Sequence, residues 1–558
     1  MKLSEAIARA VAAEIGPTPV FALIGDANLR PVGSLDRDAR AKLCFARDEG
    51  AAVAMADGFA QASGSVGVAS VTSGPGLTHA ATSLLAAGRM RTPLLVLAGD
   101  TPRHGAVGLQ AMMKFDQRRF ADACETGFHD VRSPDSLGDD VAAAFADARE
   151  RRRPVILNVP LDLQGLDMAA GWRYEPKPVA AKKPAPPGSD ALARLLDLIA
   201  QCRRPLILAG RGAVWSQARR PLEALAERTG ALLGTTLLAK GYFAGNPWAL
   251  GVVGGYSSPA GMELVREADL VLAFGAELGH FTTQANSLFR NRVVACIDIA
   301  PDAPDLPQHV RILADAGAAA AVLVAALGDA RPTGFRTAET ARRLAQPAFD
   351  GEAVAADGLL DPRALMRDLG AALPANADLV VGGGHFWSFP CLYLDPPAGG
   401  RYFCPLGAAA VGQALPFAIG VASASAERPV VAIEGDGSLL MNIQELDTAA
   451  RHKLPLALVI MNDGALSAEA IRLGMEGYDS ELAAYPSPDF AAVARGFGWR
   501  AATITGGASI GALVRQHSWR EGPLLIDARI TRKVMVDPVA VKDLSRKAPA
   551  PAGGTSGG

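Results

Sequence analysis

The sequence has little of what marks a secreted, membrane or nucleic-acid-binding protein. No run of roughly 18 apolar residues occurs, so no membrane span is expected. Apolar residues at the amino terminus follow a helical spacing that charges interrupt, and this pattern lacks the continuous apolar segment of a signal peptide. The 55 Lys and Arg residues are balanced by 57 Asp and Glu residues, which favours neither nucleic acid nor an anionic membrane as a partner. Small molecules are the expected partners.

Cysteines are also few and scattered. No Cys-x-x-Cys pair occurs among the six, which argues against a zinc ribbon or a dithiol redox centre. Reduced buried thiols in a cytoplasmic protein are the simplest account of them. The six are Cys44, Cys124, Cys202, Cys296, Cys391 and Cys404.

At 558 residues the chain has enough material for about three or four domains with separate cores. Residues 174–190 are rich in Pro, Lys and Ala without an apolar period, as expected of an extended linker. A weaker boundary lies between Leu327 and Leu360, and residues 546–558 are expected to form a disordered tail. The predicted domains are 1–173, 191–330 and 355–545.

Each predicted domain alternates short β-branched runs with helical stretches. Strands that alternate with helices form parallel sheets covered on both faces. The expected fold class is therefore α/β, with three consecutive doubly wound domains. The predicted strands are 66–71, 94–98 and 155–159 in the first domain, 206–208, 270–274 and 293–299 in the second, and 379–381, 430–433, 456–460 and 524–526 in the third.

Two acidic turns follow apolar runs in the third domain. Gly435-Asp436-Gly437-Ser438 comes after the run 428–434, and Asn462-Asp463-Gly464 comes after the run 454–461. The span between them predicts strand, turn, helix and strand, so both acidic groups lie where parallel strands end. Such strand ends form the ligand crevice of an open α/β sheet, and two hard oxygen ligands beside a Gly-rich turn suit Mg²⁺ carrying a phosphorylated cofactor. A Gly-Asp-Gly triplet alone is an ordinary tight turn, so the pairing carries the prediction.

This pairing resembles the thiamine diphosphate signature shared by pyruvate decarboxylases, benzoylformate decarboxylases and acetolactate synthase large subunits. The chain departs from the family at the second Asn of the signature, which is Asp463 here. Oxygen coordination survives this change, and the site gains a negative charge. The implied cofactor contacts are Gly435, Gly437 and Ser438, and the implied Mg²⁺ ligands are Asp436, Asp463 and the main-chain carbonyl of Ala465.

The first domain carries a second resemblance to the same family. Glu49-Gly50-Ala51-Ala52 begins a predicted helix that ends near Gly64, and Thr72-Ser73-Gly74-Pro75-Gly76 follows a strand. A carboxylate in a first helical turn also has a purely structural use, because it stabilises the positive end of the helix dipole. In the family's pyrimidine-binding domain, however, the glutamate corresponding to Glu49 hydrogen-bonds N1′ of the aminopyrimidine, and the resemblance places Gly74 in the cofactor site. A carboxyl at N1′ favours the imino tautomer, whose nitrogen removes the thiazolium C2 proton.

Two further positions of the third domain are similar to the family's cofactor site. Residues 407–416 resemble the segment whose bulky apolar residue holds the cofactor in its V shape, and by position that residue is Val411. An ordinary buried valine is the alternative. His385 follows another predicted strand and either lines the diphosphate or substrate pocket or is a structural histidine.

Two carboxylates indicate a reaction class. Asp26, within 25–28, matches the Gly-Asp-x-Asn turn of pyruvate and indolepyruvate decarboxylases, whose Asp faces the substrate. Glu469 follows Asp463 at the offset where those enzymes place an active-site Glu. Both also fit plain surface carboxylates. The His-His pair of those enzymes is missing, because the corresponding stretch contains only His104.

The second domain resembles the central domain of acetolactate synthases, which in some relatives binds FAD or ADP. Its Gly210-Arg211-Gly212 turn after a strand is a weak nucleotide signal by itself. Glu277 stands where synthases often have an Arg, so FAD or ADP is a secondary expectation.

The resemblance spans about residues 3–535 and implies a thiamine diphosphate- and Mg²⁺-dependent enzyme acting on a 2-oxo acid or related carbonyl compound. In this scheme Glu49 activates the cofactor, and Asp26 and Glu469 handle protons. A 2-oxo acid decarboxylase is the first expectation. An acetolactate-synthase-like carboligase and a non-catalytic thiamine diphosphate- or nucleotide-binding relative are the alternatives. In this family the cofactor lies between the first domain of one subunit and the third of another, which implies a homodimer or homotetramer.

Overall fold

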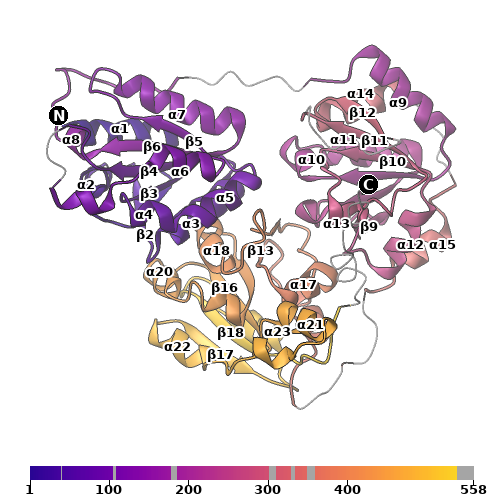
Figure 1. Ribbon diagram of the computed structural model, residues 1–558. Coiled ribbons are helices and arrows are strands. Elements are labelled where there is room, and N and C mark those ends of the chain that lie inside the picture. Colours follow the sequence, from indigo (N-terminus) through magenta and orange to yellow (C-terminus); the bar gives the residue numbers. More distant parts are fainter. Residues whose placement is uncertain are drawn as a thin grey trace, which may run out of the picture. The chain divides into compact units, whose positions relative to one another are not determined.

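The computed structural model describes residues 1–38, 40–104, 108–177, 185–300, 309–328, 334–348, 353 and 358–536. The expected tail at 546–558 and residues 178–184 of the expected linker lie outside these described residues. Packing divides the chain into two compact units, each described by itself below. The first unit holds the amino-terminal and carboxy-terminal sheets, and the second holds the central sheet (Figure 1).

The amino-terminal domain is a six-stranded parallel sheet in the order β2-β1-β3-β4-β6-β5. Alternate residues of its strands enter two different cores: Val68 and Leu95 pack in one, and Ala69 and Val96 in the other. Burial on both faces explains why the interior strands β3 and β4 are almost continuously apolar. The strands are β1 (Pro19–Ala22), β2 (Lys42–Phe45), β3 (Gly67–Val71), β4 (Leu94–Asp100), β5 (Gly127–Asp130) and β6 (Pro154–Pro160). The helices are α1 (Leu3–Ile15), α2 (Leu29–Asp36), α3 (Glu49–Ser63), α4 (Pro75–His79), α5 (Ala81–Arg89), η1 (Gly108–Met113), α6 (Gln117–Ala123), α7 (Leu137–Arg151) and α8 (Leu161–Gln164).

The carboxy-terminal domain has a sheet in the order β14-β13-β15-β16-β18-β17, with parallel pairing from β13 through β17. Its strands are β13 (Asp378–Val381), β14 (Tyr402–Phe403), β15 (Val430–Gly435), β16 (Leu456–Asn462), β17 (Arg500–Ile504) and β18 (Leu524–Arg529). Its helices are α16 (Pro362–Gly370), η3 (His385–Trp387), α18 (Ala414–Ser423), α19 (Asp436–Leu439), α20 (Glu445–Arg451), α21 (Ser467–Met475), η4 (Ser480–Ala483), α22 (Phe490–Gly496) and α23 (Ile510–Gln516).

The central unit is a parallel sheet in the order β12-β11-β10-β7-β8-β9. Residues 388–402, which include α17 (Ser388–Tyr393), pack with this unit, and the buried Lys240 ammonium binds the Cys391 carbonyl at 2.9 Å. The strands are β7 (Pro205–Ala209), β8 (Leu232–Thr235), β9 (Ala249–Val252), β10 (Leu270–Phe274), β11 (Val293–Asp298) and β12 (His309–Leu313). The remaining helices are α9 (Ser189–Gln201), α10 (Arg211–Trp215), α11 (Arg219–Thr229), η2 (Leu237–Ala239), α12 (Pro259–Glu267), α13 (His280–Thr283), α14 (Ala316–Leu327) and α15 (Ala338–Leu344).

The amino-terminal and carboxy-terminal domains share one topology. When strands are counted from the start of each domain, both sheets have the order 2-1-3-4-6-5. The central sheet instead has the order 3-2-1-4-5-6 when read from its other end, which is the order of dinucleotide-binding folds. The predicted class of three α/β domains in series is therefore confirmed, with two different strand orders.

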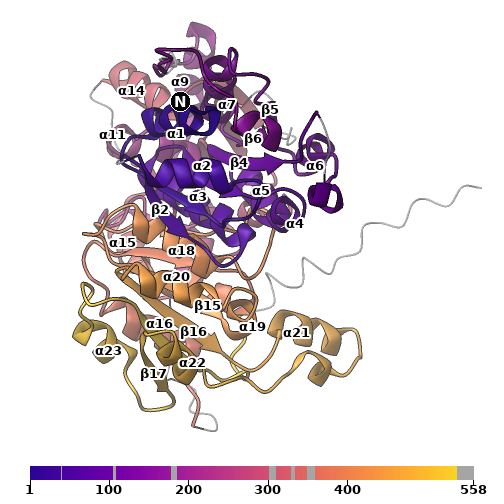
Figure 2. The same cartoon turned by 90° about the vertical axis from the view of Figure 1, so that its left-hand side faces the viewer.

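Helices α3 and α18 occupy equivalent places, each between the second and third strands of its domain, and they pack against each other (Figures 1 and 2). A Cβ on Gly58 of α3 would lie 2.0 Å from the Phe417 carbonyl oxygen. A Cβ on Gly420 of α18 would lie 1.9 Å from the Met55 carbonyl oxygen. Only glycine permits so close an approach of the two backbones, and the contact joins both domains in one apolar core.

Every strand predicted from the sequence is present, with ends shifted by at most a few residues. The strands that the sequence did not predict are mostly at sheet edges, such as β2, β9 and β17, where half or more of the residues are exposed or only partly buried. Apolar and polar residues alternate in these strands over too few positions to predict a strand from the sequence.

All six cysteines are reduced, and Cys44, Cys124, Cys391 and Cys404 are buried as expected, whereas Cys202 and Cys296 are only partly buried. None of the described helices combines the length and the apolar character that crossing a membrane requires.

Candidate functional site

The two acidic turns of the carboxy-terminal domain lie against each other at the carboxyl ends of two interior strands of its sheet. Asp436 follows β15 and Asp463 follows β16, and these strands are parallel neighbours. Asp436 is 2 % exposed, and its Oδ2 accepts a hydrogen bond of 3.1 Å from the Gly464 amide. The Ser487 hydroxyl lies 2.9 Å from the same oxygen. The backbone of the second turn is therefore fastened to the carboxylate of the first.

Asp463 holds its own turn in shape. Its Oδ1 accepts from the Ala465 amide at 3.3 Å, and its Oδ2 accepts from the Ser467 hydroxyl at 2.6 Å. The following residues pair with 483–485, through Leu466 N to Ala483 O and Tyr485 N to Gly464 O. This pairing skips the Ala465 carbonyl. Two carboxylates and one main-chain carbonyl are thus available in one place, and this is an all-oxygen set that Mg²⁺ accepts.

The polar groups beside these turns fit a diphosphate group. A Cβ on Gly437 would lie 2.4 Å from the Tyr485 hydroxyl oxygen, so only glycine at 437 lets this hydroxyl come so close to the turn. The Tyr485 hydroxyl is buried and makes no hydrogen bond with the described residues. Backbone amides at the start of α19, just after Gly435, form the kind of turn that binds phosphate oxygens.

A buried carboxyl, Glu434, connects this turn to the segment that carries Val411. Glu434 is fully buried and accepts from the amides of Ala414 and Leu415 at 3.3 and 3.2 Å, at the start of α18. The Ser438 hydroxyl donates to Glu434 Oε1 at 2.8 Å and accepts from the Gly412 amide at 2.7 Å. Burial raises the pKa of Glu434 to about 7, although all its partners are donors that favour the carboxylate.

Val411 itself is 39 % exposed, so the alternative of an ordinary buried valine is wrong. The Ser438 hydroxyl, which the sequence placed among the cofactor contacts, is used inside the protein to hold the neighbouring Gly412. These contacts fix the backbone just after Val411 without burying its side chain. An apolar group held rigidly at a surface is suited to support a ligand.

Glu49 begins α3 in the amino-terminal domain, as predicted, and α3 ends at Gly64 in a left-handed conformation. The preceding Asp48 caps the helix by accepting from the Ala51 amide at 2.9 Å. Glu49 is therefore not needed as the cap. Its side chain is 13 % exposed, with Oε2 lying 3.2 Å from Nδ1 of His79. A Cβ on Gly76 would lie 3.1 Å from Glu49 Oε1, so the glycine leaves room for the carboxylate.

The Asp26 turn lies at the same edge of the sheet as Glu49. It follows β1, which pairs with β2 on one side and with β3 on the other. Asn28 is buried and closes the turn, because its Oδ1 accepts from the Gly25 amide at 2.8 Å. Thr72, after β3, accepts from the Ala27 amide at 3.1 Å. These contacts leave the Asp26 side chain exposed at the strand ends.

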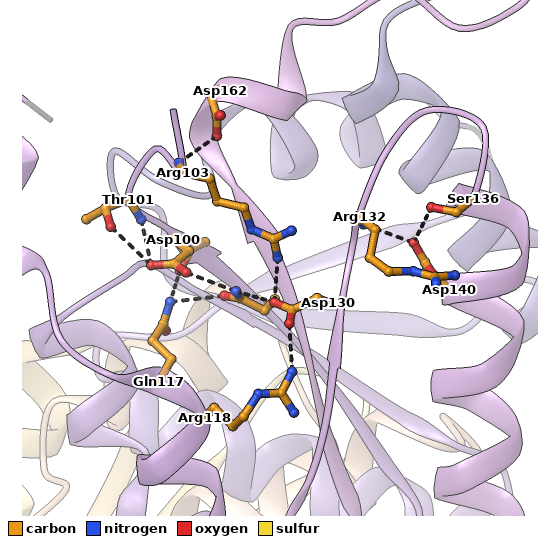
Figure 3. A network of polar contacts seen from close by, with 12 residues as sticks. Asp100, Thr101, Arg103, Gln117, Arg118, Asp130, Arg132, Ser136, Asp140 and Asp162 are labelled. Carbon is orange, nitrogen blue, oxygen red and sulfur yellow. Dashed lines mark hydrogen bonds and ion pairs between the residues drawn. The ribbon is translucent and has the colours of Figure 1, made fainter. Parts of the chain in front are cut away.

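The other half of this edge is a network of charges rather than an open site (Figure 3). Asp130, the last residue of β5, accepts from Arg103 at 2.6 Å and from Arg118 at 2.7 Å. Asp162 accepts from the backbone amides of Arg103 and His104 at 3.1 and 3.2 Å. The network fastens the segment that carries His104, the histidine that stands alone where decarboxylases have a pair.

The remaining predicted site residues, Glu469, His385 and Gly74, have fewer contacts that tie them to the acidic turns or to Glu49. Glu469 is exposed in the first turn of α21. His385 is partly buried at the start of η3, and burial lowers its pKa. Gly74 precedes α4 with φ of 61°, and a Cβ there would lie 2.8 Å from the Met113 Cβ. The positive φ and the close contact both explain the glycine.

The Gly-x-Gly turn of the central unit has a packing explanation. The Gly210 amide donates to the Phe274 carbonyl and the Gly212 amide to the Gly275 carbonyl, both at 2.9 Å. A Cβ on Gly210 would lie 2.1 Å from the Gly275 carbonyl oxygen. The two glycines are therefore explained by close backbone packing, and their amides are already hydrogen-bonded. The Gly-x-Gly turn is thus no longer an argument for phosphate binding in this unit. FAD or ADP binding stays a prediction.

Comparison with known proteins agrees with this arrangement. Family models match the three sheets in order: thiamine pyrophosphate enzyme N-terminal TPP binding domain over 1–120, central domain over 192–324 and C-terminal TPP binding domain over 382–528. The acetolactate synthase large subunit of Parasynechococcus marenigrum is 33 % identical over 480 residues, covering 83 % of this chain and 76 % of that protein. The chain belongs to the thiamine pyrophosphate enzyme family. It is therefore an enzyme, and thiamine diphosphate is the cofactor of its family.

Other members of the thiamine pyrophosphate enzyme family are almost equally similar. "Probable 2-ketoarginine decarboxylase AruI" of Pseudomonas aeruginosa is 32 % identical over 468 residues, covering 81 % of this chain and 80 % of that protein. Sulfoacetaldehyde acetyltransferase of Rhodobacter capsulatus is 30 % identical over 475 residues, covering 80 % and 79 %. Identity at this level does not separate the reactions that these names describe.

Three residues of this site escaped the sequence analysis: His79 beside Glu49, the buried Glu434, and Tyr485. Of the three, only Tyr485 could have been suspected from the sequence, because it follows the predicted metal turn 462–464 at a short distance in the chain. Distance in the sequence hides the others, because their contacts depend on how the turns fold together.

Proposed function

We propose that this protein is a Mg²⁺- and thiamine diphosphate-dependent enzyme that cleaves the carbon–carbon bond beside the carbonyl of a 2-oxo acid, as a decarboxylase. The Asp26 turn carries the proposal, because it joins an exposed carboxylate to the same sheet edge as Glu49 through the Thr72 contact. When bound, thiamine diphosphate supplies a nucleophilic carbon and an electron sink for such a cleavage.

The carboxy-terminal domain holds the cofactor in this proposal. Asp436, Asp463 and the Ala465 carbonyl bind Mg²⁺, and the turn at Gly435 and Gly437 receives the diphosphate. The contacts of Asp436 and Asp463 with the 464–467 backbone and side chains support this, because they fix the metal ligands before any ligand arrives.

The amino-terminal domain supplies the proton chemistry. Glu49 holds a proton at N1′ of the pyrimidine, and its low exposure and fixed position at the start of α3 suit that task. Asp26 and Glu469 are the proposed proton-handling groups for the substrate. Both are exposed, which leaves them able to meet a substrate.

A second copy of the chain completes the site in this proposal, as a homodimer or homotetramer. Apolar side chains are exposed beside both halves of the site: Ile24 (46 %) and Leu29 (54 %) flank Asp26, and Met441 (50 %) lies against Gly412, next to Val411. Exposed apolar groups gathered around binding residues are suited to burial in an interface.

Carboligation is the second candidate. It is favoured by the 33 % identity to an acetolactate synthase and by the single histidine in the segment fastened by Asp130 and Asp162. In that reaction the group left after cleavage passes to a second carbonyl compound instead of taking a proton.

One screen separates the two. The purified protein is stripped of thiamine diphosphate and Mg²⁺, both are restored, and a panel of 2-oxo acids is supplied with and without aldehyde acceptors while carbon dioxide and products are followed. A decarboxylase releases an aldehyde without an acceptor, whereas a carboligase forms a 2-hydroxyketone. Absence of turnover on every substrate, with the cofactor bound, rejects both reactions.

A further inference from the structure

Tyr485 has a polar atom that no described residue satisfies. It follows η4, and its backbone amide donates to the Gly464 carbonyl at 2.9 Å, so its main chain is tied to the predicted metal turn. The hydroxyl oxygen is buried and makes no hydrogen bond with the described residues. A buried hydroxyl without a partner costs free energy that a phenylalanine would avoid.

The hydroxyl lies at the acidic turns. A Cβ on Gly437 would be 2.4 Å from the Tyr485 oxygen and 3.0 Å from Leu466 Cδ2, so glycine at 437 is what lets the hydroxyl reach the backbone of the turn. A phenol hydroxyl is a hydrogen-bond donor at neutral pH.

The Asp436 carboxylate lies near this hydroxyl, but the two groups do not meet the geometry of a hydrogen bond. Asp436 Oδ2 is already engaged by the Gly464 amide and the Ser487 hydroxyl. Both oxygens of Asp463 accept from its own turn. A donor held beside a glycine turn and two carboxylates fits an anionic oxygen that arrives with a cation.

We propose that the Tyr485 hydroxyl donates a hydrogen bond to a phosphate oxygen of the metal-bound diphosphate. This inference rests on the proposed function of Asp436 and Asp463 as Mg²⁺ ligands. It assigns a cofactor contact to the segment after α21, which also supplies the Ser487 contact with Asp436 and the backbone pairing with 464–466.

The test compares Tyr485→Phe with the wild type in the full-length chain after removal of cofactor and metal. Calorimetry measures the binding of thiamine diphosphate with Mg²⁺, and separately of inorganic pyrophosphate with Mg²⁺. The second probe has no rings, so it isolates the diphosphate contact. We expect Tyr485→Phe to bind both about 10-fold more weakly, because a hydrogen bond to a charged group is lost.

Tyr478→Phe is the matched control, since Tyr478 is 63 % exposed in the same segment and should leave both affinities unchanged. Tyr485→Met is a second variant without the hydroxyl, for use if the Phe variant folds poorly. The wild type should bind both probes. If Tyr485→Phe then binds both equally well, or is weakened only toward thiamine diphosphate, the proposed contact is wrong and the proposed function still stands. A wild type that binds neither probe rejects the proposed function itself.

Discussion

The amino-terminal and carboxy-terminal domains have the same strand order, yet their sheet edges carry different chemistry. After its third strand, the first domain has the neutral turn of Thr72 and Gly74, and the last domain has Asp436. Next to it, at the end of the fourth strand, the last domain has Asp463, and the first has Asp100 within the network of Figure 3. One topology thus provides the same positions twice, and the residues placed there decide which edge suits a metal ion.

The helices that follow the second strands, α3 and α18, differ in which acidic groups meet their amino termini. Helix α3 has its own acidic residues at its start, with Asp48 as the cap and Glu49 left for other contacts. Helix α18 has none, and its first amides are satisfied by the buried Glu434 from β15. Both carboxylates stabilise a helix amino terminus, but only Glu49 keeps access to a ligand. Glu49 and Glu434 are the same residue type, and they differ in whether a ligand can reach the carboxylate.

Glu49→Gln should have the largest effect. We expect the exchange of the cofactor C2 proton with solvent to slow by about 10²- to 10⁴-fold, because an amide cannot hold the proton at N1′. Cofactor affinity should change little, since the diphosphate is held by the other domain. Nuclear magnetic resonance of quenched samples measures the exchange. Glu434→Gln is the matched carboxylate at the equivalent helix, and equal slowing in both variants would contradict the distinction drawn here.

Asp436→Asn should weaken Mg²⁺-dependent binding of thiamine diphosphate on the order of 100-fold, because it removes a charge from the metal and loosens the Gly464 contact. Asp463→Asn restores the residue of the family signature and should have a smaller effect. Binding titrations at fixed cofactor and varied Mg²⁺ measure both. Affinities that respond equally to the two changes would show that the pair does not act as proposed.

Gly58→Ala and Gly420→Ala test the contact between the equivalent helices. A Cβ at either position would lie within 2.0 Å of a carbonyl oxygen of the partner helix. We expect each to lower the free energy of unfolding by about 1–3 kcal/mol, as overpacking does. Urea unfolding measures it. Gly33→Ala in α2 is the control, because nothing lies within 4 Å of its Cβ position and stability should rise slightly.

Acid should destabilise the carboxy-terminal domain through His517, which is 6 % exposed and makes no hydrogen bond with the described residues through either ring nitrogen. Burial, helped by the charge of Arg500, lowers the pKa of His517 from 6.5 to about 4. The unfolded chain therefore binds a proton that the folded chain refuses between these pKa values, so stability is full above pH 6.5 and falls as pH drops toward 4.

His517→Phe removes this penalty and should make the protein more stable than the wild type by about 1–2 kcal/mol at pH 5, relative to neutral pH. Thermal unfolding at both pH values measures it. His129 of the amino-terminal domain is the comparison, because its Nε2 lies 3.0 Å from Asp147. His129→Phe loses that contact and should gain nothing in acid; an equal gain would contradict the argument from burial.

The sequence alone determined the three α/β domains, the interior strands and the start of α3 at Glu49, because apolar runs and capping residues act over a few neighbouring positions. It also located both acidic turns through their motifs. Tertiary structure decided what surrounds them. Val411 is exposed although its type suggests burial, and Glu434 is buried although its type suggests exposure. Such outcomes depend on contacts between residues far apart in the chain, which no local pattern encodes. The same holds for Tyr485, whose hydroxyl meets Gly437 only once the two turns have folded together.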